Sequence, residues 1–258
     1  MRLAVFAPFG LLHREAGLML LLANYLHKNG SEAIQLRCDG AQRACARDAV
    51  SGGMRTPFSC SQCMSEQSAL AQWAGVKSRA LSSCLGPEDV AQARAWLAGV
   101  SSDALFRAEF RGESLWEQCQ EQFLARWNLE GGQEIGPEQE ANLRDLFASH
   151  VQVRVASERF LAATKPTLHF VAGGKEGASR AYLLEARKFG GDVATFSCDE
   201  ESESILVRST GSQGVYETSL VLEGITSMRN DPRTWAPEVS AIVHEILSFL
   251  GYAPDRVL

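Results

Sequence analysis

The chain has 258 residues, a formal net charge of −6 at pH 7 and 45% hydrophobic residues, which is enough apolar content for a substantial core. Because it is acidic and contains no basic run, it lacks the positive surface that nucleic-acid binding requires, and we expect no nucleic-acid partner. The apolar run AGLMLLLA is far shorter than the roughly twenty residues that cross a bilayer, which predicts no transmembrane segment. The N-terminal sequence has no signal-peptide cleavage pattern, so we expect a cytoplasmic protein.

The N-terminal part has the pattern of a βαβ unit. Residues 2–7 form a short apolar run followed by a turn sequence, which predicts a buried strand. Residues 12–28 are helix-like and end at Asn29-Gly30, a common helix stop. Residues 32–36 then predict a second strand, and this order is typical of a parallel sheet.

A cysteine-rich segment, residues 38–63, follows that second strand. It contains Cys38, Cys45, Cys60 and Cys63, four of the seven cysteines, and its Gly, Ser and Arg content predicts an insertion made mainly of loop. The C-x2-C pair and the looser C-x6-C pair could complete a tetrahedral four-sulfur shell. We therefore predict a structural zinc site, while an iron–sulfur cluster and unligated or disulfide-bonded cysteines remain alternatives.

The segment 64–165 is predicted to be mostly helical. Its helices are expected at residues 65–76, 86–100, 113–127 and 137–163. The last one carries apolar residues at near-helical spacing, namely Leu143, Phe147, Val151 and Val155.

From Pro166 onward the α/β pattern returns. The sequence predicts a strand ending in a glycine turn, a helix and another strand, followed by a strand pair around GSQG and a C-terminal helix that stops at Gly251. The whole chain, residues 1–258, is thus predicted to be one α/β domain. Its expected core is a Rossmann-like parallel sheet flanked by helices, with a metal-binding cysteine insertion and a helical middle segment.

Two loops carry the candidate site residues. His13 and Glu15 follow the first strand, where open α/β sheets bind ligands, and His13 could act as a base or bind a hydroxyl group. The second loop has Gly173 and Gly174 before a helix, with Lys175 and Arg180 nearby, as expected for an anion site. A surface or capping role for His13 and a simple tight turn at the glycines are the alternatives. His150, His169 and His244 are interpreted as packing residues.

Three quoted stretches carry a family resemblance: FAPFGLLHREAGLMLLLANYLHKNGSEAIQLRCDG, the later AC and SCSQC, and KPTLHFVAGGKEGASRAYLLEARKFGGDVATF. In this order they resemble the N-terminal domains of bacterial capsule and surface-polysaccharide biosynthesis proteins, which look like GT-B glycosyltransferases. The resemblance covers residues 1–208 in outline. Where that family has Asn-Gly-Arg, this chain has Gly173-Gly174-Lys175.

The resemblance implies the acceptor-side half of a glycosyltransferase-like enzyme. His13 would then be the base, Glu15 would orient it, and Lys175 and Arg180 would contact anionic groups. The implied partners are a nucleotide sugar or a glycan acceptor and, since no second Rossmann domain is evident, a separately encoded one. The alternatives are a non-catalytic zinc-binding scaffold or partner-binding protein, and an iron–sulfur or thiol redox protein.

Overall fold

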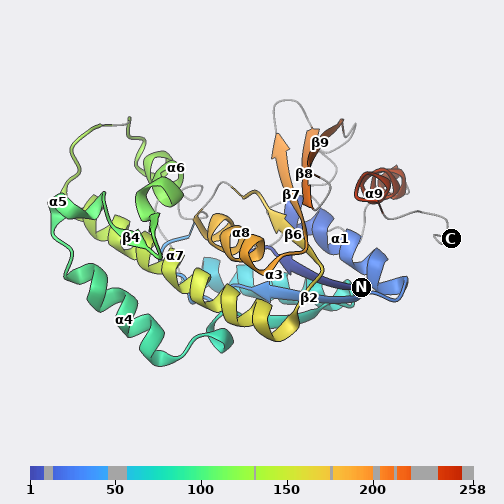
Figure 1. Cartoon of the computed structure of the whole chain (residues 1–258), viewed down its shortest axis with the longest axis horizontal. Coiled ribbons are helices and arrows are strands. Elements are labelled where there is room, and N and C mark those ends of the chain that lie inside the picture. The colour runs from blue at the N-terminus through green and yellow to red at the C-terminus, as the bar shows by residue number, and fades with distance from the viewer. Residues whose placement is uncertain are drawn as a thin grey trace.

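The fold is built around a seven-stranded sheet with the order β3-β2-β1-β6-β7-β8-β9 (Figure 1). The structure is a computed structural model, and it describes residues 1–8, 14–45, 57–130, 132–174, 177–199, 204–211, 214–221 and 238–251. The strands of this sheet are β1 (Arg2–Phe6), β2 (Glu32–Arg37), β3 (Lys77–Ala80), β6 (Leu168–Ala172), β7 (Asp192–Asp199), β8 (Ser204–Gly211) and β9 (Gly214–Val221). The first five are parallel, and β8 and β9 add an antiparallel edge.

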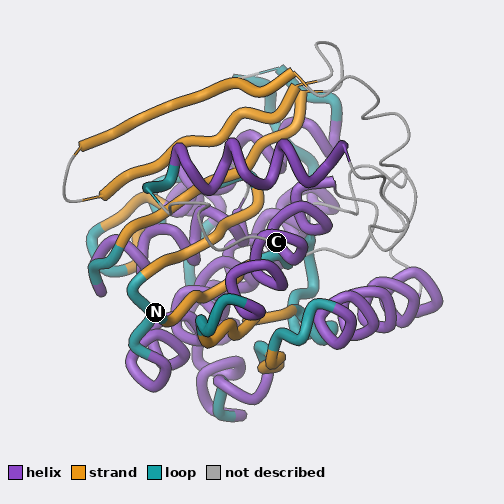
Figure 2. Tube along the Cα trace, turned by 90° about the vertical axis from the view of Figure 1, so that its right-hand side faces the viewer, coloured by secondary structure: helices purple, strands orange, loops and turns teal. Residues whose placement is uncertain are grey.

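Helices cover both faces of the sheet (Figure 2). The described helices are α1 (Arg14–Lys28), α3 (Pro57–Trp73), the 3-10 helix η1 (Ser82–Cys84), α4 (Pro87–Ala98), α5 (Ser102–Leu105), α6 (Leu115–Trp127), α7 (Pro137–Thr164), α8 (Gly177–Phe189) and α9 (Glu238–Phe249). A mostly parallel sheet flanked by helices confirms the predicted α/β class. In the described part of the chain, no helix is both long enough and apolar enough to span a membrane.

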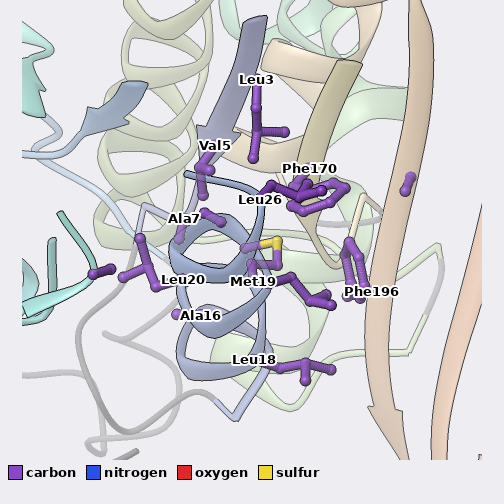
Figure 3. Close-up of a cluster of buried hydrophobic side chains, with 14 of the residues drawn as sticks. Leu3, Val5, Ala7, Ala16, Leu18, Met19, Leu20, Leu26, Phe170 and Phe196 are labelled. Carbon is purple, nitrogen blue, oxygen red and sulfur yellow. The ribbon is translucent and has the colours of Figure 1, made fainter. Parts of the chain in front are cut away.

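Alternation along β1 divides the sheet's packing between two cores. Leu3 and Val5 point to one face, where α1 packs against them (Figure 3) and residues of α3 and α9 join the same core. Ala4 and Phe6 point to the opposite face, where they meet α7 and α8. There the Phe6 ring stacks on Tyr182 with centroids 4.5 Å apart. Consecutive residues of one apolar strand therefore anchor helices on opposite sides.

A third core lies among the middle helices. It joins α4, α5, α6 and the first half of α7. Leu143, Phe147 and Val151 are buried in it, as their spacing predicts, whereas Val155 is half-buried. The second half of α7 packs on the sheet, so this helix belongs to two cores at once.

Two strand features of the middle segment escape the sequence patterns. β3 pairs in parallel with β2, but its sequence KSRA is polar and mostly exposed, as an edge strand permits. β4 (Glu109–Phe110) and β5 (Glu113–Ser114) form a small hairpin. Its two turn residues, Arg111 and Gly112, have φ of 57° and 77°, the positive values that a tight two-residue hairpin turn requires.

Candidate functional site

The sheet topology itself marks one place for a ligand. β1 lies between β2 and β6, and the helices that follow these strands lie on opposite faces of the sheet. In open α/β sheets such a reversal opens a crevice outside the carboxyl ends of the two central strands. Here those ends are Phe6 of β1 and Ala172 of β6.

A glycine turn leads from β6 into α8 at this edge. Gly173 and Gly174 have φ of 70° and 106°, which side chains other than glycine rarely adopt. The Gly173 amide donates to the carbonyl of Phe196 at 2.6 Å, which ties the turn to β7. A Cβ at Gly174 would lie 3.4 Å from Thr195 Cγ2, so the turn also lies close to β7. Both predicted glycines are thus placed at the start of a helix.

His150 on α7 packs against the first turn of that helix. Its Nδ1 lies 2.8 Å from the carbonyl oxygen of Gly177. Because a carbonyl only accepts, Nδ1 carries the proton, and Nε2 of the neutral ring is then an acceptor. Burial, together with the charges of Arg154 and Arg180, lowers the pKa of His150 to about 3. Its Nε2 has no hydrogen-bond partner among the described residues.

The first turn of α8 holds two further polar side chains. Ser179 is fully buried, and its Oγ has no hydrogen-bond partner among the residues that the structure describes. Arg180 is half-buried and donates from Nε to Oε1 of Gln118 on α6 at 2.8 Å. α6 also packs closely against Gly177, because a Cβ at this position would lie 2.9 Å from Oε1 of Gln122 on α6.

A buried ionic network holds α7 and α8 together beyond this turn. Arg154, which has no exposed surface, donates from Nε to Glu185 Oε1 and from Nη1 to Glu113 Oε2, each at 2.5 Å. Arg111 of the small hairpin bonds to Glu158 Oε2 at 2.6 Å. The network therefore connects the hairpin to both helices and fixes how they lie relative to each other.

The other predicted site residues are placed only in part. His13 and Lys175 lie outside the described residues, so their roles stay predictions. Glu15 lies in the first turn of α1 and is half-buried. Of the predicted groups, Gly173 and Gly174 form the turn after β6, and Arg180 lies in the first turn of α8. The sequence does not indicate Ser179, and for His150 it indicates only packing. His150 lies along an apolar stripe of its helix, and this pattern conceals a polar role.

The four clustered cysteines do not come together as a metal centre. Cys38 is buried just after β2, Cys45 lies in the following loop, and Cys60 and Cys63 lie on α3; none of the four forms a disulfide with a described cysteine. Over the described ranges, which include all four, no group of three or more His, Cys, Asp or Glu side chains is arranged to hold a metal ion. Within the described ranges the structure thus contains no metal site at these cysteines, which corrects the expected metal-binding insertion, while zinc or an iron–sulfur cluster stays a prediction from the cysteine spacing.

The reason lies in the local structure around these cysteines. The C-x2-C pair is in a helix that begins at Pro57, where the sequence reading expected a loop. Cys63 Sγ accepts a hydrogen bond from Gln67 Nε2 one helical turn later, at 3.3 Å. Burial raises the pKa of Cys38, and the charge of Cys60 raises it further, so the neutral thiol is favoured at Cys38.

The structure confirms the interpretation of His169 as a packing residue. His169 is buried between the hydroxyl of Tyr182 and the carbonyl of Gly190, each 3.1 Å from a ring nitrogen, which confirms a satisfied core histidine. Cys84 and Cys119 are buried, and burial strongly raises the pKa of the Cys119 thiol. The side chain of Cys198 lies outside the described residues.

Comparison with known proteins gives a distant structural likeness. No protein-family model matches the chain, and no curated protein matches its sequence. Among solved structures, the chain is similar to AlbC, a cyclodipeptide synthase from Streptomyces noursei, with 10% sequence identity and a TM-score of 0.37 over 70% of this chain and 85% of that one. The expected membership of the capsule-polysaccharide glycosyltransferases is therefore corrected, because neither sequence comparison returns that family.

Proposed function

We propose that this protein binds a phosphate-bearing small molecule at the carboxyl edge of its sheet, between β1 and β6. The observation that carries the proposal is the first turn of α8. This turn follows the glycine turn at the end of β6 and carries Arg180, and it holds or contacts two buried polar atoms that lack hydrogen-bond partners among the described residues. Open α/β sheets take their ligands at this edge.

The α8 N-terminus suits an anion for two reasons. The first amides of a helix have no intrahelical acceptor, and the aligned peptide dipoles place positive potential there. α8 has 13 residues and therefore a developed dipole, and it begins three residues after Gly174. A phosphate oxygen at this end would accept from those amides.

Arg180 adds a charge that its protein contact leaves uncompensated. Its described partner, Gln118, is a neutral amide. Within the part of the chain that the structure describes, no ion pair includes Arg180, whereas Arg154 is matched by two carboxylates. A guanidinium bonded to an amide keeps its full charge for a second, anionic acceptor.

Ser179 Oγ and His150 Nε2 indicate which hydrogen-bonding groups the ligand carries. A buried polar atom that lacks a hydrogen bond costs about 1–3 kcal/mol, and a ligand that bonds to it recovers part of that cost. Ser179 Oγ can donate to a phosphate oxygen, whereas His150 Nε2 accepts only. The ligand is therefore expected to offer a phosphate together with a hydroxyl or another hydrogen-bond donor.

Calorimetry and thermal-shift measurements with phosphate, pyrophosphate, nucleoside diphosphates, nucleotide sugars and the matching nucleosides test this proposal. We expect saturable binding of phosphorylated compounds and none of the nucleosides. Arg180→Gln should weaken binding about tenfold or more, because it removes a charged hydrogen bond.

Arg187→Gln is the matched control, since Arg187 is exposed in the last turn of the same helix. Ser179→Ala, which changes no charge, should weaken binding by a smaller factor. Absence of binding by every phosphorylated compound, or equal losses in Arg180→Gln and Arg187→Gln, would refute the proposal.

A further inference from the structure

The helical middle segment contains a pocket on the side of α6 away from α8. Its volume is about 640 Å³, and it lies between α5, α6, residues 129–130 and 132–135, and the start of α7. Cavities that take small molecules usually measure about 300–1,000 Å³. The pocket shares no lining residue with the proposed phosphate site, because Gln118 and Cys119 of α6 face α8 while Trp116 and Phe123 face the pocket.

Three aromatic rings form one wall of this pocket. Phe106 and Trp116 meet edge to face with centroids 4.8 Å apart, and Trp116 and Phe123 do so at 6.0 Å. Phe123 is fully buried, whereas Phe106 is 37% exposed, so the series runs from the core to the surface. A large exposed aromatic side chain at the mouth of a cavity offers a ring face to a ligand.

The described charged residues that line the pocket are all acidic. Asp103, Glu130, Glu134 and Glu140 contribute carboxylates, and no Lys, Arg or His is among the described residues that line the pocket. Arg144 bonds to Glu140 at 2.6 Å and lowers the pKa of that carboxyl, so Glu140 is already compensated. Among the described residues, no ion pair involves any of the other three carboxylates.

Aromatic faces beside uncompensated carboxylates attract organic cations. Rings attract a cation through their quadrupole, and the acidic rim adds a Coulomb attraction that an anionic ligand would lack. The aliphatic part of the lining, Leu124, Leu129 and Ile135, gives an apolar ligand body a matching surface.

We propose that this pocket binds a small organic cation with an apolar body, that is, an aromatic or aliphatic amine. Such a ligand would place its rings or chain against Trp116 and Phe123 and its ammonium group at the rim formed by Asp103, Glu130 and Glu134. This site is independent of the proposed phosphate site, so either can be present without the other.

Three indole compounds that differ in charge test the proposal: tryptamine, neutral tryptophol and anionic indole-3-acetate. Calorimetric titration of the full chain should show saturable binding of tryptamine, about tenfold tighter than that of tryptophol, and no binding of indole-3-acetate. The tryptamine affinity should fall as salt is raised, since the rim is exposed.

Paired variants separate the rim from the general charge of the protein. Glu130→Gln combined with Glu134→Gln should weaken tryptamine about fivefold and leave tryptophol unchanged, and both positions are exposed, so folding is expected to persist. Glu138→Gln, on an exposed residue outside the lining, should change neither affinity.

Equal affinity for the three indoles, no binding of tryptamine, or equal effects of the paired and control variants would overturn the proposal. It would also be overturned if only an oligolysine peptide bound, because the surface would then recognise a basic protein segment.

Discussion

The clearest test of the candidate site is the pH dependence of stability at His150. The ring is 1% exposed, and burial with two nearby guanidinium groups lowers its pKa to about 3 in the folded chain. In the unfolded chain the same ring has a pKa near 6.5. At a pH between these two pKa values the ring is protonated in the unfolded chain and neutral in the folded chain. Lowering the pH therefore favours unfolding.

The size of the effect follows from the two pKa values. At pH 7.5 the ring is neutral in both states and contributes almost nothing to the pH dependence. At pH 5 the unfolded ring is protonated, and the folded state loses about 2 kcal/mol, or roughly 4–8 °C in Tm for a chain of this length. His150→Gln does not titrate, and its amide can still donate to the Gly177 carbonyl.

Urea unfolding followed by circular dichroism at pH 7.5 and pH 5 measures the difference. The wild type should lose about 2 kcal/mol more than His150→Gln between these pH values, and this comparison cancels other titrating groups, including His169, whose pKa burial also lowers. His169→Gln, tested in the same way, shows how large that second contribution is. If His150→Gln lost as much stability as the wild type, the ring would titrate normally, and the buried neutral histidine would be refuted.

Three further predictions concern the framework of the site. Glu185→Gln removes a carboxylate from a fully buried arginine and should cost about 3–5 kcal/mol in urea unfolding, whereas Glu217→Gln, in an exposed pair, should cost less than about 1 kcal/mol; similar losses would contradict the buried network. Gly191→Ala should destabilise more than Gly190→Ala by thermal unfolding, because both have positive φ but only Gly191 has a backbone carbonyl 3.0 Å from a new Cβ. Cys63→Ser should cost less than about 1 kcal/mol in urea unfolding, and zinc should affect the stability of the variant and the wild type equally. A loss of several kcal/mol in the variant, together with stabilisation by zinc of the wild type alone, would support the four-cysteine metal centre.

The sequence predicts the sheet well where apolar pattern and burial coincide. β1 and β6 are continuous apolar runs because both of their faces are covered, and α1 ends at Asn29-Gly30, where Gly30 has a φ of 85°. β3 is missed for the opposite reason. It is a polar, exposed edge strand whose pairing with β2 depends on the backbone and leaves no hydrophobic pattern to read.

The candidate site is predicted only where it lies in a local motif. Gly173, Gly174 and Arg180 can be recognised because a glycine turn before a helix is a pattern within a few residues. His150 is separated by 27 residues from Gly177, its partner, and only the packing of two helices brings them together. The cysteines show the reverse error, since a spacing that suits a metal knuckle also fits the first turns of a helix.

The arrangement of α7 explains how a distant core can support a site at the sheet edge. Its first half packs among the middle helices and its second half on the sheet, and His150 and Arg154 lie one turn apart between these halves. His150 contacts the start of α8, whereas Arg154 is held by Glu185 further along the same helix. Two contacts at different points along α8 fix both its position and its rotation. The buried ionic network therefore does more than join helices, because it fixes how α8 is oriented relative to α7 and the small hairpin.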